Sequence, residues 1–274
     1  MSYILDYEGF SGRQGILFSM SSLPCYLYQS FVKFFIFTSL KTKFMNVNIL
    51  HLNEGATEAL GLTVIIDVFR AFSVECYAFH NKAEKIIAVS DINFAYSLKN
   101  ENPDYILLGE RNEAIMPGFD YGNSPSHILN RDFTGKTLVH TTSSGTQGII
   151  KAVFADEIIT GSFVNLSAIV KYIKRLKPEI VSLVCMGYAT LYPVEEDTLC
   201  AEYIKNELQG LPSNFQNMKD IIRKTSGKRF FEEDKQHFAP SSDFELCMDL
   251  NKFDFVIKAE RNGNFADMKK INIV

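Results

Sequence analysis

Several patterns that would identify common classes of site are missing from this sequence. Its five cysteines are widely spaced without a CxxC pair, and its five histidines form no HxxxH or HxH set. These absences argue against a disulfide framework and against a zinc site, and a reducing cytoplasm is the compartment that we expect. The net charge is −4, and no stripe of lysine and arginine is interleaved with aromatic residues. A nucleic-acid partner is therefore not expected.

The first 44 residues differ in composition from the rest of the chain. Residues 16–40 are rich in Phe, Leu, Ile and Tyr, and Lys33 is the only charged residue among them. Three interpretations stay open: an upstream extension that is disordered or not translated, a membrane-associating segment, or a helix packed on the domain. Pro24 and several polar residues weaken the pattern of a membrane span, so stable membrane association is not expected. We therefore divide the chain into an extension, residues 1–44, and a domain, residues 45–274.

Short apolar runs alternate with helical patterns from Met45 onward. This alternation predicts an α/β domain, a three-layer α/β/α fold with a mostly parallel central sheet. Asn165 is the expected N-cap of one helix. Residues 210–235 read as a helical excursion or loop, and residues 254–259 as a last strand that can lie at a sheet edge. Strands are predicted at residues 45–52, 62–66, 85–89, 105–108, 137–139, 157–160 and 180–185, and helices at residues 91–100, 166–176 and 198–208.

Charged side chains follow two of the predicted strands. Asp67 ends the apolar run 62–66, with Arg70 one turn further on, and Glu110 and Arg111 follow residues 105–108. In a parallel sheet the carboxyl ends of the strands share one edge, where ligands bind, so we expect these groups to lie close together. The alternatives are a helix cap for Asp67 and a surface charge pair for Glu110 and Arg111.

A hydroxyl-rich segment, residues 141–148, lies between the predicted strand 137–139 and a helix expected to begin near Ile149. Small residues and glycine let backbone amides turn toward an anion, and a helix N-terminus adds a positive dipole end. The segment lacks the lysine of a Walker loop, and a polar turn with a Ser/Thr cap is the alternative. The phosphate-binding candidates here are Thr141, Thr142, Ser143, Ser144 and Gly145.

Other strand ends supply further candidates. Asn123 and Ser124 lie in a loop dense in turn formers, and Ser162 and Asn165 follow residues 157–160. His140 also ends a strand, but a structural role is favoured because it has no evident partner. Acidic residues open the helix at residues 195–197, where the helix dipole favours them in any case. Mg²⁺ prefers one or two protein carboxylates, which Asp67 and Glu110 could supply, unless one of them transfers a proton or attacks phosphorus.

The motifs resemble the 2-phosphosulfolactate phosphatase (ComB-like) family over nearly all of residues 45–274. Each motif is weak alone, but the ordered series is specific. The series is VIIDVFRA at 64–71, GER at 109–111, PGFDYGNSP at 117–125, GKT at 135–137, TTSSGT at 141–146, GSFVN at 161–165 and EDTLCA at 196–201.

The resemblance implies a Mg²⁺-dependent phosphatase that hydrolyses 2-phospho-3-sulfolactate to 3-sulfolactate and phosphate. It implies that Asp67 and Glu110 are the catalytic residues. It also implies that the metal ligands are Asp67, Glu110, Glu196 and Asp197. The substrate is a small anionic phosphorylated molecule, and a compact α/β enzyme of this size could form a homodimer. The implied substrate-binding residues are Arg70, Arg111, Asn123, Ser124, Thr141, Thr142, Ser143, Ser144, Gly145, Ser162 and Asn165.

The chain departs from the family pattern at two positions of the hydroxyl-rich segment. We expect Asn where Ser144 stands and Arg where Gln147 stands. Loss of a cation at position 147 would weaken the binding of an anionic substrate tail. The alternative function is therefore a non-catalytic anion- or phosphate-binding protein on the same scaffold.

Overall fold

The computed structural model describes residues 45–111 and 114–273, and the structural statements below refer to these ranges. The expectations for residues 1–44 lie outside the described part of the chain. Within the described ranges, no helix has both the length and the apolar character needed to cross a membrane.

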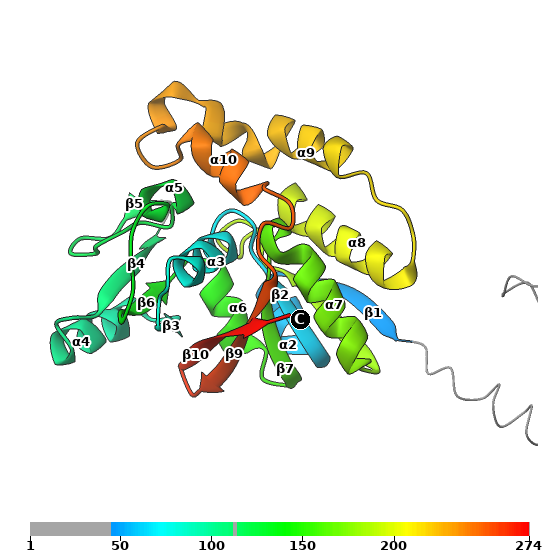
Figure 1. Ribbon diagram of the computed structural model, residues 1–274, viewed down its shortest axis with the longest axis horizontal. Helices are drawn as coiled ribbons and strands as arrows, with labels where there is room; N and C mark the ends of the chain where they lie inside the picture. Colours follow the sequence, from blue (N-terminus) through cyan, green and yellow to red (C-terminus); the bar gives the residue numbers. More distant parts are fainter. Residues whose placement is uncertain (1–44, 112–113, 274) are drawn as a thin grey trace, which may run out of the picture. The chain divides into compact units, whose positions relative to one another are not determined.

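A ten-stranded sheet forms the centre of the domain (Figure 1). The strands are β1 (Asn46–His51), β2 (Gly61–Ile66), β3 (Lys85–Val89), β4 (Ile106–Arg111), β5 (Ala114–Ile115), β6 (Thr137–Thr141), β7 (Ala155–Gly161), β8 (Ile180–Cys185), β9 (Phe255–Asn262) and β10 (Phe265–Asn272). They follow the order β1-β8-β2-β7-β9-β10-β3-β6-β4-β5. All but the first residue of β2 and of β8 are buried, because helices cover both faces of the sheet and leave no solvated side to select polar residues.

Two parallel parts of the sheet are joined by a β-hairpin. Strands β1, β8, β2 and β7 run parallel to one another, and so do β3, β6 and β4. The hairpin β9–β10 pairs antiparallel with β7 on one side and with β3 on the other. The strands of the β3, β6 and β4 part therefore point in the opposite direction to those of the β1, β8, β2 and β7 part. The expectation of one shared parallel edge is therefore wrong. The loops after β2 and β6 nevertheless meet, since the Gly145 amide bonds to Asp67, and one helix packs on both parts of the sheet.

Helices cover both faces of the sheet, which confirms the predicted three-layer α/β/α architecture. The helices are α2 (Leu52–Glu58), α3 (Ala71–His80), α4 (Ile92–Glu101), α5 (Pro125–Ile128), α6 (Gly145–Lys151), α7 (Leu166–Leu176), α8 (Glu195–Gln209), α9 (Phe215–Lys224) and α10 (Ser241–Cys247). Helices α3 and α6 lie between the two parallel parts (Figure 1), and α6 contacts β2, β3, β9 and β10. Helices α7 and α8 pack on the other face of the part formed by β1, β8, β2 and β7. Helix α4 packs on the other face of the part formed by β3, β6 and β4.

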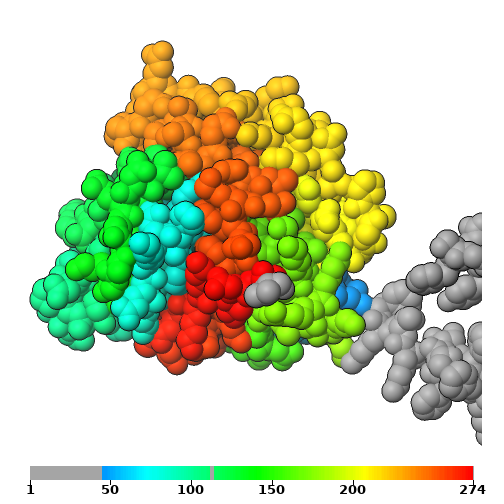
Figure 2. Space-filling model, in the orientation of Figure 1, coloured from blue at the N-terminus to red at the C-terminus, as the bar shows by residue number. Residues whose placement is uncertain are grey.

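The segment between α8 and β9 packs on α3, mainly at the N-terminal end of that helix. It contains α9, two 3₁₀ turns (Ser226–Phe231 and Glu233–Lys235) and α10, which contacts α3 and α5. Figure 2 shows this segment, in shades of orange, spread over the surface between the green α5 side and the yellow α8. The helical excursion predicted for residues 210–235 is confirmed, and it forms one wall of the site described below.

Two local predictions were wrong, and a third was confirmed in position alone. The last predicted strand is not at an edge, because β9 pairs with β7 on one side and with β10 on the other. The turn between β9 and β10 has Gly263 first, and its φ of +66° is what a two-residue hairpin turn with glycine at that position requires. Helix α6 begins at Gly145 and not near Ile149, so the hydroxyl-rich segment already contains its first turn. Asn165 occupies the N-cap position of α7, but its side chain does not cap that helix and accepts from the backbone amide of Ser162.

Candidate active site

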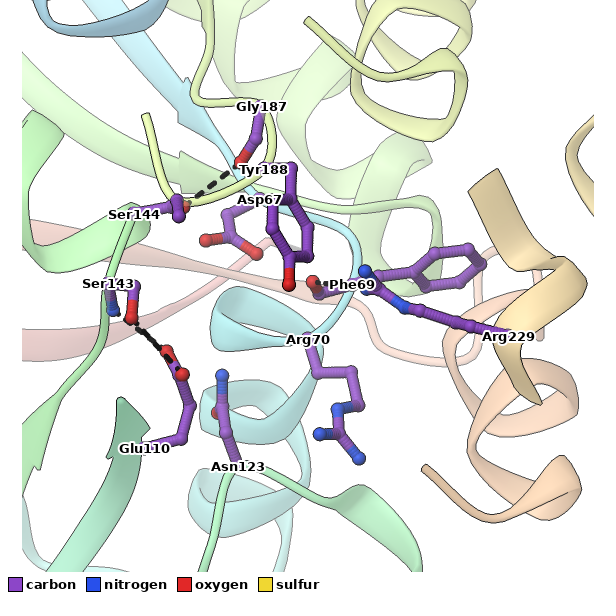
Figure 3. Close-up of a pocket in the computed structure, with 11 residues that line it drawn as sticks. Asp67, Phe69, Arg70, Glu110, Asn123, Ser143, Ser144, Gly187, Tyr188 and Arg229 are labelled. Carbon is purple, nitrogen blue, oxygen red and sulfur yellow. Dashed lines mark hydrogen bonds between the residues drawn. The ribbon is translucent and has the colours of Figure 1, made fainter. Parts of the chain in front are cut away.

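A pocket with about 430 Å³ of space, partly open to solvent, lies where the ends of β2, β4, β6 and β8 meet the segment after α8. Figure 3 shows Asp67 and Glu110 on facing walls, with the Tyr188 ring beside Asp67. Six of the residues singled out from the sequence line it. The lining residues are Asp67, Phe69, Arg70, Glu110, Asn123, Ser143, Ser144, Gly187, Tyr188, Ala189 and Arg229.

Asp67 follows β2 and is held by two backbone amides. Its Oδ1 accepts from Ala71 at 3.1 Å, and its Oδ2 accepts from Gly145 at 2.9 Å. The bond to Ala71 caps α3, so the helix-cap interpretation holds together with a place in the pocket. Burial raises the pKa of Asp67 to about 7 against the effect of these amides, and the charges of Glu110 and Glu196 raise it further. A cation bound next to Asp67 would therefore stabilise its ionised form.

Glu110 lies near the end of β4 and is 8% exposed, so it is no surface residue. One carboxylate oxygen accepts from the Ser143 amide at 2.8 Å, and the other accepts from the Ser143 hydroxyl at 3.1 Å. In the segment 141–148, Ser143 therefore bonds to Glu110, and the Gly145 amide bonds to Asp67. Two amides expected to face a phosphate donate to carboxylates in this structure.

Glu196 and Asp197 are buried in the first turn of α8 and do not line the pocket. The two carboxylate oxygens of Asp197 accept from the amides of Val68 and Gly187, each at 2.9 Å. This residue therefore joins the loop after β2 to the loop after β8. Burial raises the pKa of Asp197 and of Glu196, and the charge of Arg229 opposes the rise for Glu196. Both carboxylates add negative charge behind Asp67.

Arg70 forms a buried ion pair that the sequence gave no reason to expect. Its Nη1 donates to Asp243 Oδ2 and to the Phe238 carbonyl, both at 2.7 Å. Asp243, at the start of α10, also accepts from the Ser124 hydroxyl and the Ser126 amide. The guanidinium of Arg70 points away from Asp67 (Figure 3). Its position ties α3, α5 and α10 together along one wall.

Arg111 and Gln147 lie outside the pocket lining. Arg111 donates to the Thr141 hydroxyl at 2.7 Å and to the Ser90 carbonyl at 3.1 Å, and the amide of Gln147 donates to the same carbonyl at 2.9 Å. Burial lowers the pKa of Arg111, and the charge of Glu110 opposes this change. These two side chains brace the ends of β4 and β6 against the β3–α4 turn.

The remaining candidates, apart from Ser144, support the pocket from outside. Thr142 and Thr146 exchange bonds, with each backbone amide donating to the other residue's hydroxyl. Ser162 shares a hydrogen bond with Ser73 of α3 at 2.6 Å, and Asn165 donates to the Phe255 carbonyl. Ser144 does line the pocket, and its hydroxyl donates to the Gly187 carbonyl at 3.0 Å.

Sequence reasoning missed Arg229 as a lining residue. Its guanidinium lies 5.2 Å from the Phe230 ring centre, 5.6 Å from that of Tyr188 and 6.0 Å from that of Phe69, and it donates to the Phe69 carbonyl. Aromatic faces stabilise a guanidinium and fix its plane. The only sequence signal was the motif GKR at 227–229, which lies in a segment without strands.

The donor set suits a hard cation held in part by other ligands. Among the described residues, no three His, Cys, Asp or Glu side chains are grouped so that they could form a metal cage. Asp67 and Glu110 are two carboxylates in one pocket, and each oxygen of an ionised carboxylate can accept more than one contact. Mg²⁺ takes one or two carboxylates and completes its shell with water and phosphate oxygens. These two carboxylates therefore suit Mg²⁺ better than a metal ion whose ligands are all protein side chains.

Two carboxylates, hydroxyls, a side-chain amide and two arginines line one pocket beside an α/β sheet, a polar pocket of the kind found in α/β enzymes. The chain matches the family model described as 2-phosphosulpholactate phosphatase over residues 50–262. It belongs to the 2-phosphosulfolactate phosphatase family.

Individual relatives agree with the family assignment. The chain is 29% identical over 217 residues to a probable 2-phosphosulfolactate phosphatase of Bacillus subtilis (strain 168), covering 77% of this chain and 92% of the relative. It is 33% identical over 219 residues to a protein of the same description from Caldanaerobacter subterraneus subsp. tengcongensis, covering 73% and 88%. A third protein of that description, from Thermotoga petrophila, is 40% identical over 142 residues, covering 52% and 60%.

Proposed function

We propose that this chain is a Mg²⁺-dependent phosphoric monoester hydrolase that acts on a small 2-phosphorylated hydroxy acid, with 2-phospho-3-sulfolactate as the substrate suggested by the relatives' names. The observation that carries the proposal is the pairing of Asp67 and Glu110 in one pocket. The rise in the pKa of Asp67 supports a cation there, because burial and the charge of Glu110 leave its carboxylate short of positive charge.

In the proposed reaction a water oxygen bonds to phosphorus as the ester bond to the substrate's C2 oxygen breaks, which gives the hydroxy acid and inorganic phosphate. Asp67 and Glu110 would hold Mg²⁺, and the bound ion supplies positive charge at the phosphoryl oxygens. The hydroxyl of Ser144 and the amide of Asn123 line the same space and supply neutral polar contacts. Phosphoryl transfer depends mainly on such positioning and charge stabilisation.

Arg229 is the cation that we assign to the second anionic group of the substrate. Arg111 lies outside the pocket lining, and the guanidinium of Arg70 is turned to Asp243. Arg229 lines the pocket between aromatic rings, and its charge also acts on Glu196. A guanidinium presents paired donors that match a sulfonate or a carboxylate. Gln147 bonds to the Ser90 carbonyl outside the pocket, so the departure at this position does not itself remove a pocket cation.

A panel of phosphate esters tests the proposal. Purified protein with Mg²⁺ should release inorganic phosphate from 2-phosphorylated hydroxy acids that carry a sulfonate or carboxylate, and much less from a simple alkyl phosphate. A chelator should abolish the release, and added Mg²⁺ should restore it. Binding of these esters without any hydrolysis across the panel would contradict the proposal and favour the non-catalytic anion-binding alternative.

A further inference from the structure

Three buried side chains form a continuous chain from the core to the pocket. Glu75 of α3 and His140 of β6 are fully buried, and Asn123, in the loop before α5, lines the pocket. His140 Nδ1 lies 2.8 Å from Glu75 Oε1, and His140 Nε2 lies 3.2 Å from Asn123 Oδ1. A carboxyl group inside an apolar helix needs a polar partner, and His140 supplies it for Glu75.

The position of protons along this chain follows from its acceptors. The structure places Oδ1 of Asn123 beside Nε2 of His140. An amide oxygen only accepts hydrogen bonds, so in this arrangement Nε2 carries a proton that it donates to Asn123. A second proton lies between Nδ1 and Glu75: either the imidazolium faces a carboxylate, or the neutral ring accepts from a protonated carboxyl. Both arrangements keep Nε2–H. Only a neutral ring protonated at Nδ1 would reverse the donor and acceptor roles.

A proton on Nε2 in turn fixes the orientation of the Asn123 amide. With Oδ1 held by His140, the Nδ2 group points into the space between Glu110 and Asp67, as Figure 3 shows. The reversed amide would set two donors against each other, which disfavours it by roughly tenfold to a hundredfold. An acceptor at this place would repel an anion in a pocket that already has two carboxylates.

We infer that Asn123 is a pre-oriented hydrogen-bond donor to the phosphoryl group of the substrate, and that His140 and Glu75 are positioning residues that set the direction of its amide. The identity of the anion rests on the proposed function. The direction of the amide does not. Partners behind a contacting group that fix its tautomer and orientation are a common feature of polar sites.

The protonation of His140 is measurable without substrate. Protein labelled with ¹⁵N at histidine is examined by long-range ¹H–¹⁵N correlation, and the His140 ring is assigned from the signals lost in His140→Gln. The expected spectrum shows a proton on Nε2. An unprotonated Nε2 together with a protonated Nδ1 would overturn the inference, because Asn123 would then have to turn its oxygen toward the pocket.

Anion binding tests the second half of the inference. Asn123→Asp retains an oxygen that accepts from His140, but it replaces the donor in the pocket by an acceptor. Titration with inorganic phosphate in the presence of Mg²⁺ should show affinity reduced by about tenfold or more, with the Nε2 proton of His140 still present. Asn217→Asp, an exposed change on α9 that adds the same charge, should bind phosphate as the wild type does.

The outcomes separate this inference from the proposed function. Wild-type affinity in Asn123→Asp would overturn the assignment of Asn123 even if the protein hydrolyses its substrate. Protein that neither binds phosphate nor hydrolyses any ester would overturn the proposed function and the anion assignment together. The spectrum of His140 would still decide the direction of the amide.

Discussion

The backbone amide of Gly145 donates a 2.9 Å hydrogen bond to Oδ2 of Asp67, a residue 78 positions earlier in the chain. This bond joins the loop after β2 to the start of α6, which follows β6, and so connects the two parallel parts of the sheet. It also holds one oxygen of the carboxylate to which we assign the cation. The two parts of the fold and the site therefore share one contact.

Gly145→Ala should reduce phosphatase activity sharply. A Cβ here would lie 2.9 Å from Ala71 Cβ and the Phe72 ring and 3.0 Å from Asp67 Oδ2, so the start of α6 must move away from Asp67. Gly122→Ala is the matched control, because its Cβ would meet only Ile115 at an ordinary 3.5 Å. Steady-state kinetics should show kcat lowered in the first variant alone. Wild-type kcat in Gly145→Ala would contradict the importance of this contact.

Stability without divalent cations should fall as pH rises. The pKa of Asp67 is raised from 3.8 to about 7, mainly by burial, so between these values the folded state binds more protons than the unfolded state. The free energy of unfolding therefore decreases as pH rises from about 4 to 7, by on the order of 1 kcal/mol or more. Urea unfolding measured across this range should show the decrease.

The same experiment in Asp67→Asn should give a shallower slope, because the titrating carboxyl is gone. Added Mg²⁺ should stabilise the wild type most near neutral pH, where the carboxylate is ionised. A wild-type unfolding free energy that rises over this range would contradict the assigned direction of the pKa shift.

Asp243→Ala should destabilise the fold by about 3 kcal/mol, because it leaves the buried Arg70 without its carboxylate partner. The control is Glu245→Ala in the same helix, whose exposed pair with Lys219 should contribute less than about 1 kcal/mol. Urea denaturation of both variants measures the difference. Equal losses would show that the Arg70–Asp243 pair does not hold this wall.

Arg229→Gln should affect substrates according to their second anionic group. For a 2-phosphorylated hydroxy acid with a sulfonate or carboxylate, we expect kcat/KM to fall roughly tenfold or more, with a much smaller change for an alkyl phosphate. Arg223→Gln is the control, since this residue lies on α9 outside the pocket and pairs with Glu245. An equal loss for both substrates in Arg229→Gln would remove Arg229 as the determinant of specificity.

Much of the fold could be predicted from local patterns. The strands at residues 62–66, 85–89 and 180–185 agree with the structure within one residue, because buried parallel strands require continuous apolar runs. The meeting of Asp67 and Glu110 in one pocket also followed from their places at strand ends, although the reason given, a single parallel edge, was wrong. The hairpin β9–β10 reverses the sheet between them, and no pattern in β2 or β4 reports that.

The rest of the site depends on contacts between distant segments. Asp243 is buried in its ion pair with Arg70, and Arg229 reaches the pocket from a 3₁₀ turn. Neither residue follows a strand, so the rule that site residues lie at strand ends does not find them. His140 and Glu75 form a pair 65 positions apart, which spacing along the chain does not reveal. Tertiary packing alone brings Arg229 to the pocket and the other residues to positions behind its walls.

The most direct test of the central claim is phosphate release by matched wild-type, Asp67→Asn and Glu110→Gln proteins, with and without Mg²⁺, on 2-phosphorylated hydroxy acids. We predict that the wild type releases inorganic phosphate only with Mg²⁺ and that both variants, although folded, release little under either condition. Undiminished release by either variant, or release by the wild type that a chelator does not affect, would contradict the assignment of Asp67 and Glu110 as the cation-binding centre of the site.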